Sequence, residues 1–149
     1  MSEFEEKVII DAITRMLARR EHSIDEIKRK LQAKGIPDEA FLPVLNQFVE
    51  ARVQSNERYA ESRARSLANK GSGPAKIRAD LMQRGVSERD IESAFEDLEV
   101  DWYALACEVR IKKFGRALPQ TYEKRVRQMQ FLQYRGFEMS HINYAVSGD

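Results

Sequence analysis

The fold is decided by residues 73–86, which read GPAKIRADLMQRGV. Pro74 suits the first position of a helix, because the N–H that proline lacks would be unpaired there in any case. Ile77 and Leu81 are four residues apart and therefore lie on one face of that helix. Gly85 can adopt the left-handed conformation that closes a helix, since it has no Cβ. The stretch thus predicts one short helix whose start and end are both specified.

The same helix ending occurs three times, around Gly35, Gly85 and Gly136. Each time a leucine, two further residues, a cation, the glycine and an apolar residue follow one another. The glycines recur about every 50 residues, and self-similarity at such a period is typical of repeat proteins. We therefore expect the three glycines at equivalent helix ends, each with left-handed backbone.

Apolar residues at three- and four-residue spacing predict helices between these endings, and no stretch alternates long enough to predict a strand. The first helix is expected from about Phe4 to Arg20. Its apolar stripe comprises Phe4, Val8, Ile9, Ala12, Ile13, Met16 and Leu17. Ser23 and Glu26 form a capping box at the start of the second helix. The buried face of the third helix comprises Phe41, Val44, Leu45 and Phe48.

These patterns predict an all-α protein of three tandem three-helix repeats, with boundaries at 1–54, 55–100 and 101–149. A single three-helix repeat cannot bury a full core alone, so neighbouring repeats are expected to stack into an elongated, curved body. The chain has 149 residues, of which 42% are hydrophobic and 33% are charged. This composition is typical of a folded globular protein rather than a disordered one.

The net charge of +1 conceals a strong segregation of charge along the chain. Residues 15–34 carry +4, residues 58–84 carry +5 and residues 110–135 carry +7, whereas residues 88–101 carry −6. In stacked repeats this pattern would place cations on one side and acids on the other. A cationic face can bind the phosphates of nucleic acid or the acidic face of a protein, and the sequence does not choose between these partners.

We expect the partner-binding residues among the cations that lie off the apolar stripes and flank turns. They are Arg63, Lys70, Lys76, Arg78, Lys124, Arg125 and Arg135. Aromatic residues are sparse among the basic segments, and Tyr59, Tyr122 and Tyr134 are each expected to pack rather than to stack on bases.

A search for catalytic and metal-binding groups finds no site. His22 and His141 fall in different repeats, and Cys107 has no histidine nearby in sequence. We therefore expect a packed thiol, no metal, no cofactor and no enzyme.

The acidic N-terminus is unlike a signal peptide, no segment resembles a membrane span, and a lone cysteine forms no intrachain disulfide. These features favour a cytoplasmic protein without a membrane association, and we expect a monomer.

Five segments together resemble the RecX family. They are residues 20–23 with 26–27 and 30–31, then 57–62, 70–78 (KGSGPAKIR), 101–102 and 131–137 (FLQYRGF), in order along almost the whole chain. Two positions depart from the family pattern: Asn56 replaces an acidic residue and Tyr59 replaces a phenylalanine. They concern one helix start and one packing position.

The resemblance implies tandem three-helix repeats and a non-enzymatic function. Members of this family bind the filament that the RecA recombinase forms on DNA, and they suppress its ATPase, coprotease and strand-exchange activities in DNA repair and the SOS response. The alternative is a helical-repeat protein that binds single- or double-stranded DNA through phosphates on its own. Both functions would use the basic face, so composition does not separate them.

Overall fold

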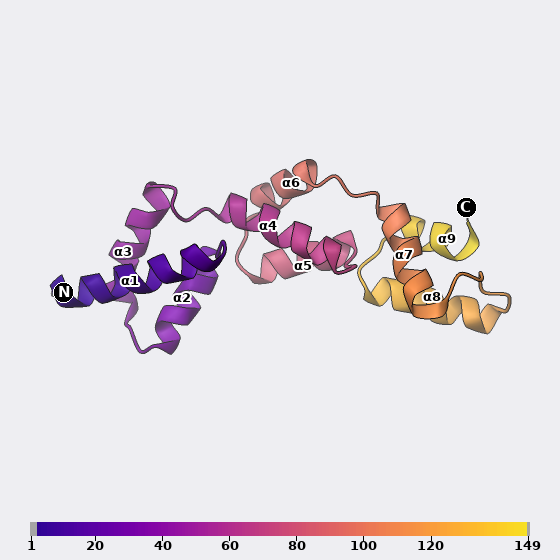
Figure 1. Cartoon of the computed structure of the whole chain (residues 1–149), viewed down its shortest axis with the longest axis horizontal. Coiled ribbons are helices and arrows are strands. Elements are labelled where there is room, and N and C mark those ends of the chain that lie inside the picture. Colours follow the sequence, from indigo (N-terminus) through magenta and orange to yellow (C-terminus); the bar gives the residue numbers. More distant parts are fainter. Residues whose placement is uncertain (1–2, 149) are drawn as a thin grey trace. The chain divides into compact units, whose positions relative to one another are not determined.

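The computed structural model describes residues 3–148, with side chains from residue 5 onward, and this part of the chain contains nine α-helices and no strand (Figure 1). The helices are α1 (Glu3–Arg19), α2 (Ile24–Ala33), α3 (Asp38–Glu50), α4 (Asn56–Asn69), α5 (Pro74–Gln83), α6 (Glu88–Asp97), α7 (Trp102–Phe114), α8 (Tyr122–Tyr134) and α9 (Met139–Ser147). The all-α prediction is confirmed. None of the described helices combines the length and the apolar character needed to cross a membrane.

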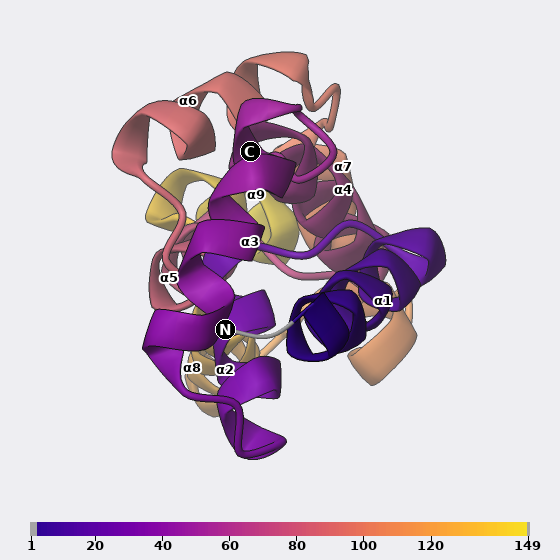
Figure 2. The same cartoon turned by 90° about the vertical axis from the view of Figure 1, so that its left-hand side faces the viewer.

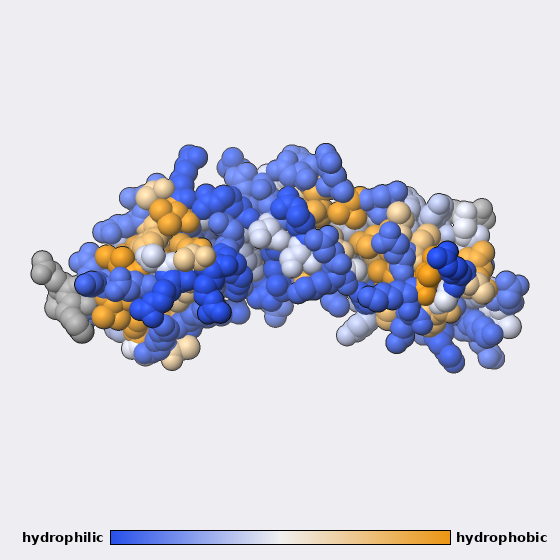
Figure 3. All heavy atoms as spheres, in the orientation of Figure 1, coloured by the Kyte–Doolittle hydropathy of each residue, from blue (hydrophilic) through white to orange (hydrophobic). Residues whose placement is uncertain are grey.

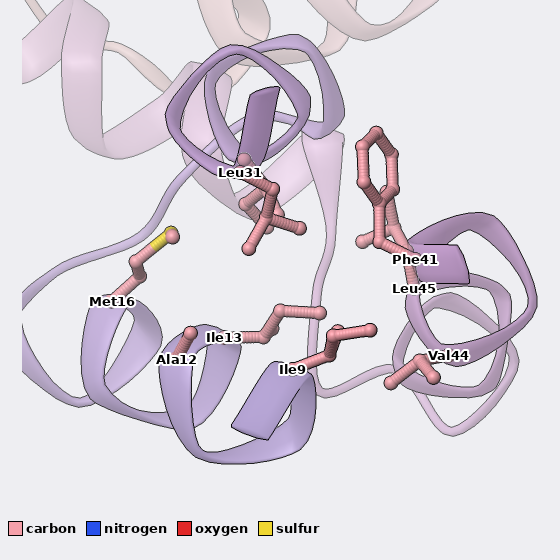
Figure 4. Packing of buried hydrophobic residues seen from close by; sticks show 9 residues of the cluster. Ile9, Ala12, Ile13, Met16, Leu31, Phe41, Val44 and Leu45 are labelled. Carbon is pink, nitrogen blue, oxygen red and sulfur yellow. The ribbon is translucent and has the colours of Figure 1, made fainter. Parts of the chain in front are cut away.

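Helices α1, α2 and α3 lie side by side around one hydrophobic core (Figures 1 and 2). Ile13 of α1, Leu31 of α2 and Phe41 of α3 are fully buried and point toward one another (Figure 4). The predicted stripe is wrong at Val8, which is 45% exposed. Val8 precedes Ile9 by one residue, or about 100° around the helix, and so lies at the edge of the buried face. Phe4 is also predicted to lie on this stripe, but its side chain is outside the part of the chain that the structure describes.

The three repeated helix endings have the predicted left-handed glycines. The φ angles are 81° at Gly35, 81° at Gly85 and 95° at Gly136. At the end of α2 the N–H of Ile36 donates to the carbonyl of Leu31, 3.2 Å away. This hydrogen bond spans six residues, as in the Schellman motif that a left-handed glycine permits. It satisfies a carbonyl at the helix end that would otherwise be unpaired.

The chain divides into two compact units, one of Met1–Ser62 with Met82–Ala94 and one of Arg63–Leu81 with Phe95–Asp149. In the second unit the start of α5 docks on the end of α8 through its backbone. The N–H of Gly73 donates to the carbonyl of Arg135 (2.8 Å), and that of Ala75 donates to the carbonyl of Gly136 (2.9 Å). A Cβ on Gly73 would lie 2.5 Å from the Gly136 oxygen. Glycine is therefore required at position 73 for close approach and not for its φ.

In the first unit, Glu26 of α2 contacts four residues: two from the connection between α1 and α2, one from α4 and one that follows α5. Its carboxylate accepts hydrogen bonds from the backbone N–H of Ser23 (3.2 Å), from Arg20 (3.0 Å) and from the hydroxyl of Tyr59 (3.1 Å). Arg84 lies 3.4 Å from its second oxygen. Burial alone would raise the pKa of Glu26, but the hydrogen bonds outweigh burial and hold that pKa below its usual value. The predicted capping box is confirmed, and its glutamate serves a second purpose.

His22 is buried beside this cluster and is bonded on both sides of its ring. Its Nε2 lies 2.9 Å from Nζ of Lys30, and its Nδ1 lies 3.1 Å from the carbonyl of Arg20. A lysine ammonium can only donate, so Nε2 accepts and the ring proton is on Nδ1. Burial lowers the pKa of His22, and the charges of Arg20 and Lys30 lower it further.

We predict that the folded protein loses stability as the pH falls below about 6.5, the ordinary pKa of histidine. In this range the unfolded chain takes up a proton at His22 that the folded chain resists, with a slope of at most about 1.4 kcal/mol per pH unit. The free energy of unfolding, measured in urea between pH 7.5 and 5.5, should decline more steeply in the parent than in His22→Gln. Equal slopes for the two proteins would contradict the burial of a neutral His22.

We also predict that Gly73→Ala destabilises the protein by about 1–3 kcal/mol, because the added methyl group meets backbone rather than a flexible side chain. Gly35→Ala is the matched control, since its φ is left-handed but a Cβ there meets nothing within 4 Å. Both variants should be less stable. Only Gly73→Ala should accelerate hydrogen exchange at the Ala75 amide through local opening, and unchanged local exchange there would refute the docking.

Candidate binding surface beside the α4–α5 turn

A basic hollow of about 520 Å³ lies beside the turn that connects α4 to α5. Its walls come from the end of α4 with the following turn, from α7 and from α8. The lining residues are Asn69, Lys70, Gly71, Leu105, Glu108, Val109, Lys112, Lys113, Phe131 and Arg135. Four of them are cations and one is an acid, so the hollow attracts anionic groups. We call it the α4–α7–α8 hollow.

The position of Arg135 in this hollow is fixed by the turn itself. Its Nη2 donates to the carbonyl of Lys70 at 2.9 Å, and a Cβ on Gly71 would lie 2.5 Å from that nitrogen. Gly71 also has a φ of 93°, which other residues rarely adopt. The glycine therefore provides both the turn and the space that the guanidinium occupies.

The ring of Phe131 forms an aromatic contact for two of the cations. Nζ of Lys113 and Cζ of Arg135 each lie 5.6 Å from its centroid, and Phe114 packs edge-on against it at 5.4 Å. A cation over an aromatic face is attracted by the ring quadrupole. These contacts hold the charged groups close together although the cations repel one another.

The structure gathers three of the seven predicted partner-binding residues near the turn. Lys70 and Arg135 line the hollow, and Lys76, in the first turn of α5, places its Nζ 5.0 Å from the ring centroid of Tyr134. Lys124 and Arg125 are exposed in the first turn of α8 and do not line the hollow.

The other two predicted residues contact neighbouring side chains. Arg63 of α4 makes two hydrogen bonds, of 3.0 and 3.1 Å, to the carboxylate of Asp80 in α5. Arg78 is half-buried, with its guanidinium 4.9 Å from the ring centroid of Phe95. Both residues therefore also help to hold α4, α5 and the end of α6 within the second unit.

Sequence reasoning missed part of this surface. Lys112 and Lys113 belong to the basic segment that the sequence identifies, but their position opposite Lys70 depends on tertiary packing. The expectation for the tyrosines is confirmed for Tyr59, which is 2% exposed, and is wrong for the two on α8. Tyr122 is 81% exposed and Tyr134 is 77% exposed. Both sit at the ends of α8, beyond the face that the packed residues of that helix occupy.

The groups considered for catalysis are spread over the described structure. Burial raises the pKa of the Cys107 thiol, which disfavours the reactive thiolate. His141 is buried in α9 and packs edge-on against Tyr103 at 4.8 Å. Within residues 3–148, no three histidine, cysteine, aspartate or glutamate side chains are grouped to hold a metal ion.

Hydrophilic residues predominate on the face drawn in Figure 3, where hydrophobic atoms form smaller separate groups. The α4–α7–α8 hollow combines charged groups with the apolar side chains of Leu105, Val109 and Phe131.

Three domain profiles of one family match the chain in succession. They describe the first three-helix domain of RecX (residues 10–48), the second (55–94) and the third (99–146). The prediction of three three-helix repeats is thereby confirmed.

Relatives of similar length carry the same family name. The chain is 44% identical over 133 residues to "Regulatory protein RecX" of Pseudomonas entomophila (strain L48), covering 89% of this chain and 86% of that protein. It is 39% identical over 141 residues to the protein of that name from Halorhodospira halophila (strain DSM 244 / SL1), covering 95% and 88%.

Two solved structures have the same fold. A crystal structure of regulatory protein RecX superposes with a TM-score of 0.82 at 23% identity, covering 97% of this chain and 74% of that one. The crystal structure of RecX from Lactobacillus salivarius gives a TM-score of 0.79 at 19% identity, covering 99% and 97%. With three successive domain matches and relatives 39–44% identical over most of its length, the chain belongs to the RecX family.

Proposed function

We propose that this protein is a cytoplasmic regulator that binds RecA–DNA filaments and lowers the ATPase, coprotease and recombinase activities of RecA in DNA repair and the SOS response. It acts by binding and not by catalysis. The relatives named as regulatory proteins support the class of function. The observation that carries the proposal is the α4–α7–α8 hollow, in which cations from α7 and from the turns after α4 and α8 are held together.

The contact surface comprises the seven predicted cations together with the two lysines on the opposite wall of the hollow. They are Arg63, Lys70, Lys76, Arg78, Lys124, Arg125 and Arg135, with Lys112 and Lys113. Within the described chain, Lys70, Lys112 and Lys113 have no carboxylate partner, so their charges are available to a ligand. Arg135 uses one nitrogen on the turn and retains donors for a planar carboxylate or phosphate.

Reversing the charge on two walls of the hollow should weaken inhibition of RecA. For Lys70→Glu with Lys112→Glu we predict that at least tenfold more protein is needed for half-inhibition of the RecA ATPase on single-stranded DNA, about 1.4 kcal/mol. Both side chains are exposed, so thermal melting should be nearly unchanged. Lys7→Glu with Arg89→Glu, which alters the net charge equally on exposed positions elsewhere, should inhibit like the parent. Full inhibition by the hollow variant would exclude the hollow as the contact surface.

A second candidate function, binding single-stranded nucleic acid without RecA, is favoured by the two exposed tyrosines of α8. Tyr122 is followed by Lys124 and Arg125, and Tyr134 lies beside Lys76 and Arg135. Aromatic rings that stand among cations can stack on bases while the cations meet phosphates. The basic residues are shared with the RecA proposal, and only the tyrosines distinguish the two functions.

On this second function, Tyr122→Ala with Tyr134→Ala should weaken binding to a single-stranded oligonucleotide by at least tenfold, since each stacked base contributes about 1–3 kcal/mol. The logarithm of affinity should also fall by about 0.7 per contacted phosphate for each log unit of salt. Tyr103→Ala, at another exposed tyrosine, is the control. A tyrosine variant that binds the oligonucleotide like the parent would exclude the stacking platform, whatever its effect on RecA.

A further inference from the structure

The first unit contains a second basic hollow, of about 980 Å³, between α1 and α2. One wall carries Arg15 and Arg19, four residues apart on α1, and the other carries Lys30 of α2 and Lys34, the residue that caps the end of α2. The remaining lining residues are Ala12, Met16, Ala18, Arg20, His22 and Ala33, so none of the described lining residues is acidic. We call it the α1–α2 groove.

Three cations of the groove have no counter-charge among the residues that the structure describes. Within the described residues, Arg15, Arg19 and Lys34 take part in no ion pair or side-chain hydrogen bond. The other two are engaged, since Arg20 pairs with Glu26 and Lys30 donates to His22. Like charges four residues apart on a helix destabilise it slightly, and an anion between them removes that repulsion.

The geometry points to an acidic amphipathic helix of a partner protein as the ligand of this groove. Residues four apart on a helix are separated by about 6 Å along its axis. Glutamates four apart on a bound helix therefore match the spacing of Arg15 with Arg19 and of Lys30 with Lys34. The exposed small side chains of Ala18 and Ala33 allow a helix to approach closely, over a floor formed by the buried Ala12 and Met16.

A protein ligand fits this groove better than a nucleic acid does. None of its described lining residues is a phenylalanine, tyrosine or tryptophan, so unstacked bases would find no platform there, whereas α8 exposes two tyrosines. The exposed apolar groups among the cations are Ala18 and Ala33, whose methyl groups suit the side chains of another helix rather than ribose and phosphate. The charge and the shape of the groove therefore both favour carboxylates that are carried by a helix.

The test uses the full chain and a synthetic alanine-rich helical peptide with glutamates at three positions four residues apart. A peptide of the same composition with the glutamates distributed around the helix is the ligand control. We expect the first peptide to bind at least tenfold more tightly in fluorescence anisotropy, because only it presents carboxylates at the spacing of the groove cations. Equal affinities would overturn the helical match and leave only general charge attraction.

Arg15→Glu with Arg19→Glu should reduce binding of the matched peptide at least tenfold, and Arg15→Gln with Arg19→Gln tests the same point with less risk to folding. Both arginines are exposed, and Lys7→Glu with Arg89→Glu is the charge-matched control that should bind like the parent. A peptide with lysines in place of the glutamates should bind the Glu variant better than it binds the parent. If Lys7→Glu with Arg89→Glu also lost binding of the matched peptide, the proposal would be overturned.

Two further outcomes would assign the groove to another ligand. Tighter binding of a single-stranded oligonucleotide than of the matched peptide, lost in Arg15→Gln with Arg19→Gln, would make it a nucleic-acid site. Dimerisation of the full chain in analytical ultracentrifugation, abolished by the same variant, would assign it to a second copy. RecA is absent from these measurements, so their failure leaves the proposed function of the α4–α7–α8 hollow intact.

Discussion

Two peptide N–H groups at the start of α5 and two carbonyls at the end of α8 satisfy one another, and the candidate binding surface of the second unit depends on this contact. A helix leaves N–H groups unpaired at its start and carbonyls unpaired at its end, and these ends carry opposite partial charges. Gly73 and Gly136 allow the two backbones to meet without an intervening Cβ. Because the contact fixes the residue before Gly136, it also places Arg135 against the carbonyl of Lys70.

The cations of the chain divide into two groups with different physical roles. Arg63 pairs with Asp80, and Arg110 is buried, donating to the carbonyls of Arg116 and Ala117 after α7. Such residues satisfy polar groups within the protein. Lys70 and Lys112 have no acidic partner among the described residues and remain exposed. A count of charge along the sequence adds the two groups together and therefore overstates the charge that a ligand can meet.

The helices and their ends could be predicted because their causes are local. Gly85 ends α5 through its own backbone freedom, and the Ser23–Glu26 box begins α2 through bonds within four residues. The binding surface could be predicted only in part, because its causes are not local. The exposure of Tyr134 and the pairing of Arg63 depend on packing between helices distant in sequence. The need for glycine at position 73 likewise arises from Gly136, 63 residues later.

The two basic hollows differ in what lies between their cations, and this difference governs what each can bind. In the α4–α7–α8 hollow, Lys113 and Arg135 contact the ring of Phe131, so part of their charge is directed at an aromatic face. In the α1–α2 groove, the cations flank small and flexible side chains, and Arg15 and Arg19 have no partner among the described residues. Charge draws an anionic ligand to both sites. The groups between the charges differ as well, with an aromatic ring in the hollow and small aliphatic side chains in the groove, and we therefore propose a different ligand for each.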